Sequence, residues 1–238
     1  MKYPEDFINK IILGDCLEVM KDIPDKSIDL VLTDPPYGVT GLEWDNDKTE
    51  WMNDILRISK KDSAIVVFGT QPFTSKIIYE YRKHFRYCWV WNKKIAGNPL
   101  IAKYQPLKIH EDIIVFSKKT HSYYPIMIQG TMRKKGGGKS NLLSMQMSET
   151  VNDNYYPTSI LEFSNSKRGQ HPTEKPVELI KYLVQTYSKE NDLILDPFLG
   201  SGTTAVACKQ LKRNFIGIEI SEKYCEIARQ RLRQEQLF

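Results

Sequence analysis

The chain has 238 residues, of which 41% are hydrophobic and 26% are charged, the balance of a globular protein that can bury a substantial core. No apolar run approaches the roughly 20 residues of a membrane span, and residues 1–10 are too polar for a secretory signal peptide. The four cysteines have neither a Cys-x-x-Cys pair nor a zinc spacing, so we expect a cytoplasmic protein with reduced thiols and no metal site.

The net charge of +5 is unevenly distributed along the chain. Residues 76–139 contain 14 Lys or Arg against 3 acidic residues, a balance of +11, which leaves −6 for all other residues. Aromatic residues are interleaved with these cations. This mixture suits a polyanion that carries bases, because Lys and Arg neutralise phosphates while aromatic rings stack on bases. A solvated basic face above core aromatics is the alternative.

Short strand patterns alternate with helical patterns in the first half of the chain. Strands are expected over residues 8–13, 28–32, 63–68, 85–91 and 111–116. Helices are expected from Asp15 to about residue 21, from Thr49 to about residue 59, and from Pro72 to about residue 83. Asp15 and Thr49 can cap their helices, and Pro72 fits a first helical turn.

The regular pattern lapses over residues 117–157, where a run of three glycines and a Lys and Arg cluster predict either a specialised insertion or a mobile loop. Strands at residues 159–163, 193–195 and 215–218 then alternate with helices that end near residues 187 and 211, and Ser221 caps a last helix. This alternation predicts a single α/β domain over residues 1–238, built on a doubly wound, mostly parallel sheet.

The first candidate site is Asp34-Pro35-Pro36-Tyr37, directly after the strand at residues 28–32. Two successive prolines remove two backbone donors, so the chain leaves the strand by a stiff turn whose carbonyls have no local N–H partner. A carboxylate, an acceptor carbonyl and a ring face held together suit a flat molecule with an amino group, such as a nucleobase. Taken alone, a simple strand-ending turn is the alternative.

The second candidate site is the turn that follows Asp196, in which Gly200 and Gly202 precede a helix. Glycines allow a ligand to approach the backbone closely, with helix N–H groups pointing at it. Glu219, at the end of the next strand, can accept hydrogen bonds from both hydroxyls of a ribose. Together these residues describe a nucleoside site.

Ligands of doubly wound sheets bind at the carboxyl ends of the strands, so Asp34, Asp196 and Glu219 are expected to converge on one edge. Their combination predicts a nucleoside cofactor beside a site for an aromatic amine. A phosphate-binding P-loop is excluded, because no Gly-Lys-Ser/Thr follows the glycine turn and residues 138–140, which end in that way, have Arg133 where the leading glycine is needed. On the glycine turn and Glu219 alone, a dinucleotide enzyme remains open.

The motifs Asp34-Pro35-Pro36-Tyr37 and Phe198-Leu199-Gly200-Ser201-Gly202 resemble the two hallmarks of the S-adenosylmethionine-dependent amino-methyltransferases of DNA. Their order, with the catalytic motif first, is similar to the permuted β class of that family. The resemblance covers the chain from Asp15 to Glu219. It implies a Rossmann-like, circularly permuted fold, S-adenosylmethionine as cofactor, and methyl transfer to the exocyclic amine of a base flipped out of double-stranded DNA.

The resemblance also implies roles for individual residues. The catalytic group is Asp34, Pro35, Pro36 and Tyr37, in which the Asp34 carboxylate and the Pro36 carbonyl accept from the target amine and Tyr37 stacks on the base. The cofactor-binding residues are Asp15, Thr173, Lys175, Asp196, Phe198, Gly200, Ser201, Gly202, Thr203 and Glu219. Thr173 and Lys175 would hold the methionine carboxylate, and Asp15 would face the adenine amino group, with a helix cap alone as the alternative.

Target recognition is expected in residues 117–157, by the same resemblance. The expected DNA contacts are Lys93, Lys94, Arg133, Lys134, Lys135 and Lys139, with a flexible, solvated loop as the alternative for the last four. The resemblance alone also implies that Asp rather than Ser at position 34 favours adenine N6 over cytosine N4. Methylation of RNA or of a protein glutamine remains open as a different activity, as does a catalytically silent DNA-binding module. A homodimer and a cognate restriction endonuclease are left open.

Overall fold

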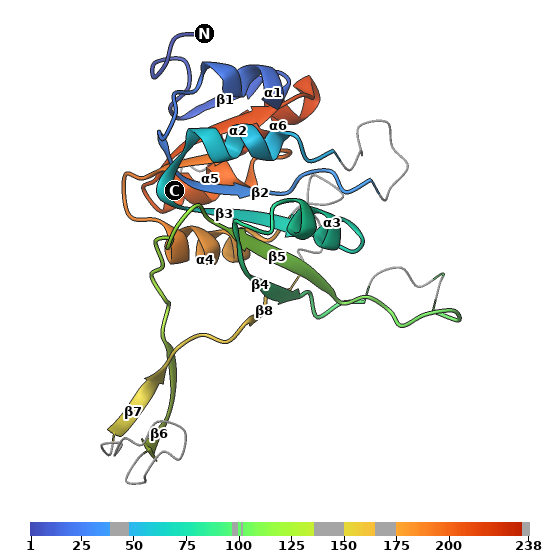
Figure 1. The fold of residues 1–238 in the computed structure, drawn as a ribbon, viewed down its shortest axis with the longest axis vertical. Coiled ribbons are helices and arrows are strands. Elements are labelled where there is room, and N and C mark those ends of the chain that lie inside the picture. Colours follow the sequence, from blue (N-terminus) through green and yellow to red (C-terminus); the bar gives the residue numbers. More distant parts are fainter. Residues whose placement is uncertain (39–47, 97–99, 101, 136–149, 165–174, 235–238) are drawn as a thin grey trace. The chain divides into compact units, whose positions relative to one another are not determined.

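The computed structural model describes residues 1–38, 48–96, 100, 102–135, 150–164 and 175–234. The chain forms two compact units, a larger one of Met1–Tyr124 and Ser159–Phe238 and a smaller one of Pro125–Thr158. The strands of the larger unit (Figure 1) are β1 (Lys10–Leu13), β2 (Ile28–Thr33), β3 (Ser59–Gly69), β4 (Phe85–Asn92), β5 (His110–Phe116), β8 (Ile160–Glu162), β9 (Leu193–Asp196) and β10 (Asn214–Glu219). Its helices are α1 (Cys16–Val19), the 3-10 turn η1 (Met20–Asp22), α2 (Trp51–Ile58), α3 (Phe73–Glu80), α4 (Val177–Tyr187), α5 (Thr203–Gln210) and α6 (Glu222–Gln234).

The eight strands of the larger unit form one sheet in the order β1-β10-β9-β2-β3-β5-β4-β8. Neighbouring strands are parallel except around β5, which runs antiparallel to both β3 and β4. The last two strands of the chain, β9 and β10, lie between β1 and β2. This arrangement confirms the predicted α/β fold with a doubly wound, mostly parallel sheet.

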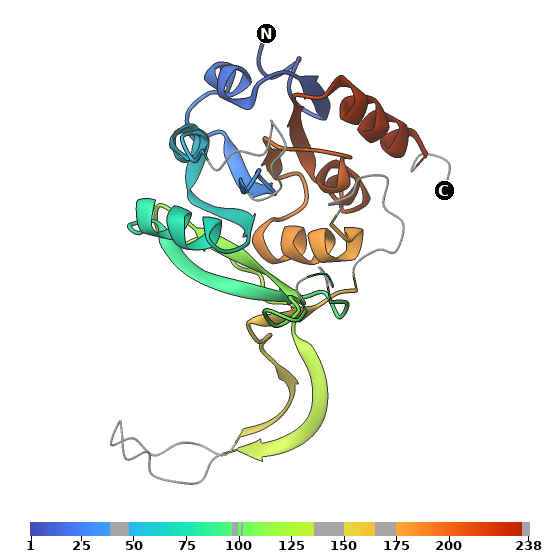
Figure 2. The ribbon, with the colours of Figure 1, turned by 90° about the vertical axis from the view of Figure 1, so that its right-hand side faces the viewer.

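Alternating side chains of the central strands divide the core into two clusters, one on each face of the sheet. Leu30 and Leu32 face the cluster that includes residues of α4, α5 and α6, whereas Val31 faces the cluster that includes residues of α1, α2 and α3. Both faces of the sheet are therefore covered by helices (Figures 1 and 2), and the central strands are apolar throughout, as expected for a parallel sheet. A sheet shielded in this way presents only its edges to ligands.

Most element boundaries agree with the sequence prediction to within two or three residues, except that β3 begins at Ser59, four residues before the expected start. The prediction of Thr49 as the cap of α2 is wrong, because the N-cap position is Glu50 and no side chain caps it. The hydroxyl of Thr49 instead donates to the Glu80 carboxylate of α3, and its carbonyl accepts from the Tyr81 hydroxyl at 3.0 Å. A tertiary hydrogen bond has replaced the local one.

The smaller unit contains an antiparallel pair of strands, β6 (Ile128–Lys135) and β7 (Thr150–Tyr155). No regular pattern was expected here from the sequence, and that expectation is wrong for these two segments. A two-stranded sheet buries neither face, so its strands need no alternation of apolar and polar residues. Ile128, Met132 and Val151 are accordingly exposed. At Gly130, a Cβ atom would lie 2.7 Å from the Tyr155 ring, so a side chain at this position would have to displace that ring.

A helix that spans a bilayer needs about 20 predominantly apolar residues. None of the helices in the described parts of the chain has that length and apolar character.

Candidate active site

Four acidic residues end or follow strands whose carboxyl ends lie at one edge of the sheet. The register pairs Leu13 of β1 with Glu219 of β10, and Gly217 of β10 with Asp196 of β9. Strand β2 pairs in parallel with β9, so Asp34 follows at the same edge, and Asp15 lies just beyond β1. The expected convergence of Asp34, Asp196 and Glu219 on one edge is therefore confirmed by the topology.

Asp196 links the two sequence motifs at this edge. Its carboxylate accepts from the Thr33 hydroxyl at 2.8 Å, from the backbone N–H of Phe198 at 3.1 Å and from the Thr204 hydroxyl at 2.6 Å. Burial raises the pKa of Asp196 to about 6, against the lowering effect of these hydrogen bonds. Because Thr33 immediately precedes Asp34, this carboxylate fixes the Asp34-Pro35-Pro36-Tyr37 motif against the glycine turn.

The glycine turn requires left-handed backbone at two positions. Gly200 has φ +54° and Gly202 has φ +86°, a region that favours glycine. A Cβ atom on Gly202 would lie 2.6 Å from the Cβ of Ala228 in α6, whereas one on Gly200 would meet nothing within 4 Å. The first glycine thus borders open space, and the second allows α5 to pack on α6.

Glu219 is held beside this turn by two backbone donors. Its carboxylate accepts from the N–H of Gly200 at 2.8 Å and from the N–H of Ser221 at 2.8 Å. An ionised carboxylate has about four lone-pair sites, so Glu219 retains acceptor capacity for ligand hydroxyls. The open space at Gly200 and this oriented carboxylate fit a nucleoside cofactor.

The sequence analysis missed Arg231 of α6, which contacts the same turn. Its guanidinium donates to the Ser201 carbonyl at 2.9 Å, to the Ser201 hydroxyl at 2.8 Å and to the Thr203 hydroxyl at 3.2 Å. Both predicted cofactor contacts, Ser201 and Thr203, therefore have a protein donor. No local signal distinguishes Arg231 from the other arginines of α6, which is why the sequence could not identify it.

Asp34, Pro35, Pro36 and Tyr37 form a compact group beside the turn. The Tyr37 hydroxyl donates to the Asp34 carboxylate, and the Tyr37 ring packs on Phe73 with the ring centroids 5.3 Å apart. Among the described residues, no hydrogen bond reaches the carbonyl of Pro36. The expected acceptor carbonyl is thus available, next to a carboxylate whose direction is set by the neighbouring phenol.

Lys175 lies against the same carboxylate. Its ammonium donates to Asp34 and lies 3.6 Å from the second oxygen of Glu111, the first of whose oxygens accepts from Lys93 at 2.7 Å. Burial alone lowers the pKa of Lys175, but the carboxylates of Asp34 and Glu111 outweigh it and raise the pKa above its usual value. The sequence analysis missed Glu111, which lies at the start of β5. An acidic residue at the beginning of an apolar strand was the signal that could have identified it.

The remaining predicted residues lie as follows. Asp15 caps α1, since its carboxylate accepts from the N–H of Leu17 at 2.8 Å, and its contact with a cofactor stays a prediction. The ring of Phe198 lies edge-on to Trp51, with centroids 5.5 Å apart. Thr173 lies outside the described residues.

The predicted DNA contacts are in different surroundings. Lys94 pairs with Glu162 at 3.1 Å, and Lys93 is largely buried by its pairing with Glu111. Arg133 is exposed on β6, with its guanidinium 5.9 Å from the centre of the Tyr155 ring. Lys134 and Lys135 are the last residues of β6, and Lys139 lies outside the described residues.

Cysteine chemistry has no support at this edge. The described residues contain no group of three His, Cys, Asp or Glu side chains able to hold a metal ion, and all four cysteines are free thiols. Burial raises the pKa of Cys88 to about 11 and that of Cys16 to about 12, and it also raises the pKa of buried Cys208. None of these three thiols is therefore activated as a nucleophile.

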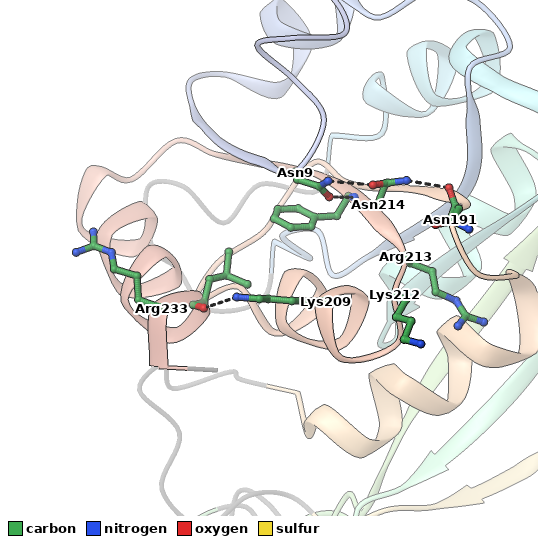
Figure 3. A pocket seen from close by; sticks show the side chains of 9 residues that line it. Asn9, Asn191, Lys209, Lys212, Arg213, Asn214 and Arg233 are labelled. Carbon is green, nitrogen blue, oxygen red and sulfur yellow. Dashed lines mark hydrogen bonds between the residues drawn. The ribbon is translucent and has the colours of Figure 1, made fainter. Parts of the chain in front are cut away.

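A pocket of about 530 Å³ lies at the opposite edge of the sheet. Asn214 begins β10 and Asn191 precedes β9, so the pocket borders the amino ends of these strands (Figure 3). Lys209 and Arg213, which also line it, donate to backbone carbonyls of the protein. Its position separates it from the acidic residues, and it is not the candidate active site.

Comparison with known proteins identifies the family. A family model described as DNA methylase matches residues 28–230. The chain is 31% identical to the type II methyltransferase M.HinfI of Haemophilus influenzae, over 96% of this chain and 69% of that protein. It is 28% identical to the DNA adenine methyltransferase YhdJ of Escherichia coli (strain K12), over 93% of this chain and 82% of that protein.

A solved structure extends the comparison to three dimensions. The crystal structure of the M1.HpyAVI complex with S-adenosylmethionine has a TM-score of 0.68 and 26% identity, covering 94% of this chain and 98% of that one. The fold is thus the Rossmann-like fold of class I methyltransferases. The family match begins at the first residue of β2 and ends in α6, so it includes both motifs. The chain belongs to the family of S-adenosylmethionine-dependent DNA methylases.

Proposed function

We propose that this protein transfers a methyl group from S-adenosylmethionine to the N6 amine of an adenine flipped out of double-stranded DNA. One observation carries the proposal: the Asp34 carboxylate and the open Pro36 carbonyl lie beside a glycine turn to which Asp196 ties them through Thr33. A site for an aromatic amine therefore adjoins a site for a nucleoside cofactor. That juxtaposition is what group transfer to the amine requires.

The cofactor would be held by residues at the carboxyl ends of β1, β9 and β10. The backbone at Gly200 and Gly202 allows close approach, and Glu219 has the lone pairs to accept from the two ribose hydroxyls. Phe198 would pack beside the cofactor, and Asp15 would face its adenine amino group. When bound, S-adenosylmethionine supplies an electrophilic methyl group on a sulfonium.

The protein must activate the amine, because its lone pair is delocalised into the base. Hydrogen bonds from the amine to the Asp34 carboxylate and to the Pro36 carbonyl localise that lone pair and orient it. The carboxylate would also stabilise the positive charge that develops on nitrogen as the nitrogen–carbon bond forms and the methyl–sulfur bond of the cofactor breaks. That charge would be lost when the amine releases a proton. Tyr37 stacks on the base, and its hydroxyl, which donates to Asp34, holds the carboxylate in place.

The base must leave the duplex to reach this site, at an unpairing cost of a few kcal/mol. The β6–β7 pair presents the exposed Arg133 and the end of a Lys-rich strand, which suits contact with phosphates. We assign target recognition to residues 117–157, which include this pair.

A homodimer and a cognate restriction endonuclease remain predictions, which light scattering and co-purification from the native host can test.

Adenine is favoured over cytosine by the Asp at position 34 and by the similarity to an adenine methyltransferase. The family also includes enzymes that methylate N4 of cytosine. The deciding experiment offers duplex DNA, RNA and protein with S-adenosylmethionine labelled on its methyl group, then digests the nucleic acids to nucleosides. We expect N6-methyldeoxyadenosine. N4-methyldeoxycytidine overturns the base assignment, and label confined to RNA or protein overturns DNA as the substrate.

A further inference from the structure

Four charged side chains form a continuous chain beside the candidate active site. Lys175 donates to Asp34 and lies 3.6 Å from Glu111, which in turn accepts from Lys93 at 2.7 Å. The charges alternate along this chain of Asp34, Lys175, Glu111 and Lys93. Side-chain exposure falls from 25% at Asp34 to 9% at Lys175 and 16% at Glu111, so water screens the inner pair poorly.

The Lys175 ammonium has its charged and aromatic contacts within the protein itself. Besides the two carboxylates, its ammonium lies 5.1 Å from the centre of the Phe68 ring in β3. A buried ammonium is costly unless it is paired and hydrogen-bonded, and the two carboxylates supply that pairing from β5 and from the turn after β2. The buried ammonium is therefore stabilised by protein carboxylates alone, without the carboxylate of a cofactor.

Glu111 carries an unusual acceptor. Its second oxygen is buried and has no hydrogen-bond partner among the described residues, although the Lys175 ammonium lies only 3.6 Å away. Buried polar atoms are normally hydrogen-bonded, whereas this oxygen has an ion pair with Lys175 that is slightly too long for a hydrogen bond and leaves room for the ammonium to come closer. The target amine would compete with the Lys175 ammonium for the Asp34 carboxylate. When the amine binds, the ammonium can therefore move toward this oxygen of Glu111.

We propose that Lys175 is a positioning residue for Asp34, and that Glu111 holds its ammonium in place when the target amine binds. This proposal rests on the proposed amine methylation. The ammonium fixes the plane of the Asp34 carboxylate before the base arrives. Glu111 then offsets the positive charge of Lys175, so that Asp34 still acts as an acceptor as charge develops on the amine.

The role differs from a contact with the methionine carboxylate of the cofactor, and the two can be separated. If Lys175 positions Asp34, Lys175→Met lowers the single-turnover rate constant by about 100-fold at saturating cofactor and DNA, the scale of a misplaced reacting group. Its dissociation constant for S-adenosylmethionine stays within about threefold of wild type, because no direct contact is lost. If it binds the cofactor, the affinity falls and the rate at saturation recovers.

The pH dependence of the rate provides a readout that a purely structural role would not move. The groups that face the ammonium are Asp34 and Glu111, with Tyr37 behind the first and Lys93 and Lys108 near the second. Since Glu111 raises the pKa of Lys175, Glu111→Gln lowers that pKa. The rate should therefore fall at a lower pH on the alkaline side in Glu111→Gln than in wild type.

The experiment compares single-turnover methylation of a duplex, cofactor affinity by calorimetry, and the pH profile, in wild type, Lys175→Met and Glu111→Gln. The matched controls are Lys181→Met and Glu178→Gln, which break an exposed pair of 3.0 Å on α4. If Lys175→Met does not fold, Lys175→Cys treated with 2-bromoethylamine rebuilds a lysine-like ammonium, and wild type treated in the same way controls for the four native thiols. A rate regained to that of treated wild type supports the proposal, whereas no gain in folded protein overturns it.

Two results overturn the positioning role while the wild type methylates DNA: a wild-type rate in Lys175→Met at saturating cofactor, or an unmoved alkaline limb in Glu111→Gln. A wild type that methylates no DNA at all overturns the proposed function, and this inference with it.

Discussion

The two glycines of the glycine turn, Gly200 and Gly202, should respond differently to the same substitution. In Gly202→Ala, the new Cβ lies 2.6 Å from Ala228, and the backbone has φ +86°. The left-handed conformation costs about 1–2 kcal/mol for a residue with a side chain. Overpacking adds about 1–3 kcal/mol, so we expect a loss of about 2–5 kcal/mol of unfolding free energy. In Gly200→Ala, only the conformational cost of about 1–2 kcal/mol applies, because its Cβ meets nothing within 4 Å.

The open space at Gly200 is where the cofactor is proposed to lie, so function should be affected in the opposite order. Gly200→Ala is expected to weaken S-adenosylmethionine binding at least about tenfold, or 1.4 kcal/mol, while remaining folded. Urea unfolding followed by circular dichroism measures the first effect, and calorimetric titration measures the second. Equal destabilisation of the two variants, or full cofactor affinity in Gly200→Ala, would refute this division of roles.

Three further outcomes follow from the structure. Arg133→Ala should weaken DNA binding and reduce the slope of log affinity against log salt by about one unit, as loss of one phosphate contact predicts; an unchanged slope excludes Arg133 from the interface. The folded pKa of Asp196 is raised to about 6 from 3.8, so the native state binds the extra proton between these values, and stability falls by about 3 kcal/mol in all as the pH rises from below 3.8 to above 6. Urea unfolding should show this loss in wild type and in the exposed control Asp6→Asn but not in Asp196→Asn. Tyr37→Phe keeps the ring and loses the hydroxyl that donates to Asp34, so its methylation rate should fall less than that of Tyr37→Ala, and equal rates would remove the ring from the mechanism.

The sequence was informative for candidate functional residues that lie at or directly after the end of a strand. Asp34, Asp196 and Glu219 each come at or just after the end of an apolar run, and the parallel sheet brings such positions to one edge whatever the loops do. Two successive prolines and two glycines add turns with few alternative conformations. For these residues, the local sequence pattern is therefore enough to predict their position in the fold.

Other residues depend on contacts between segments far apart in the chain. Glu111 and Lys175 are separated by 64 positions, and Arg231 contacts the turn only because α6 packs on α5 at Gly202. No local sequence pattern indicates that these residues are in contact. The β6–β7 strands were missed for a related reason, since a sheet of two strands buries no face and so leaves no period-two pattern to read.

The role of Asp34 can be tested in a single comparison. Wild type and Asp34→Ala are mixed with methyl-labelled S-adenosylmethionine and duplex DNA, and the rate constant of a single turnover, the labelled nucleoside and the cofactor affinity are measured together. We expect N6-methyldeoxyadenosine from wild type, no detectable transfer by Asp34→Ala, and a cofactor affinity within about threefold of wild type, because the carboxylate acts on the transition state rather than on the cofactor. Transfer by Asp34→Ala at the wild-type rate, or loss of transfer that only follows loss of cofactor binding, would contradict the assignment of Asp34 as the acceptor of the target amine.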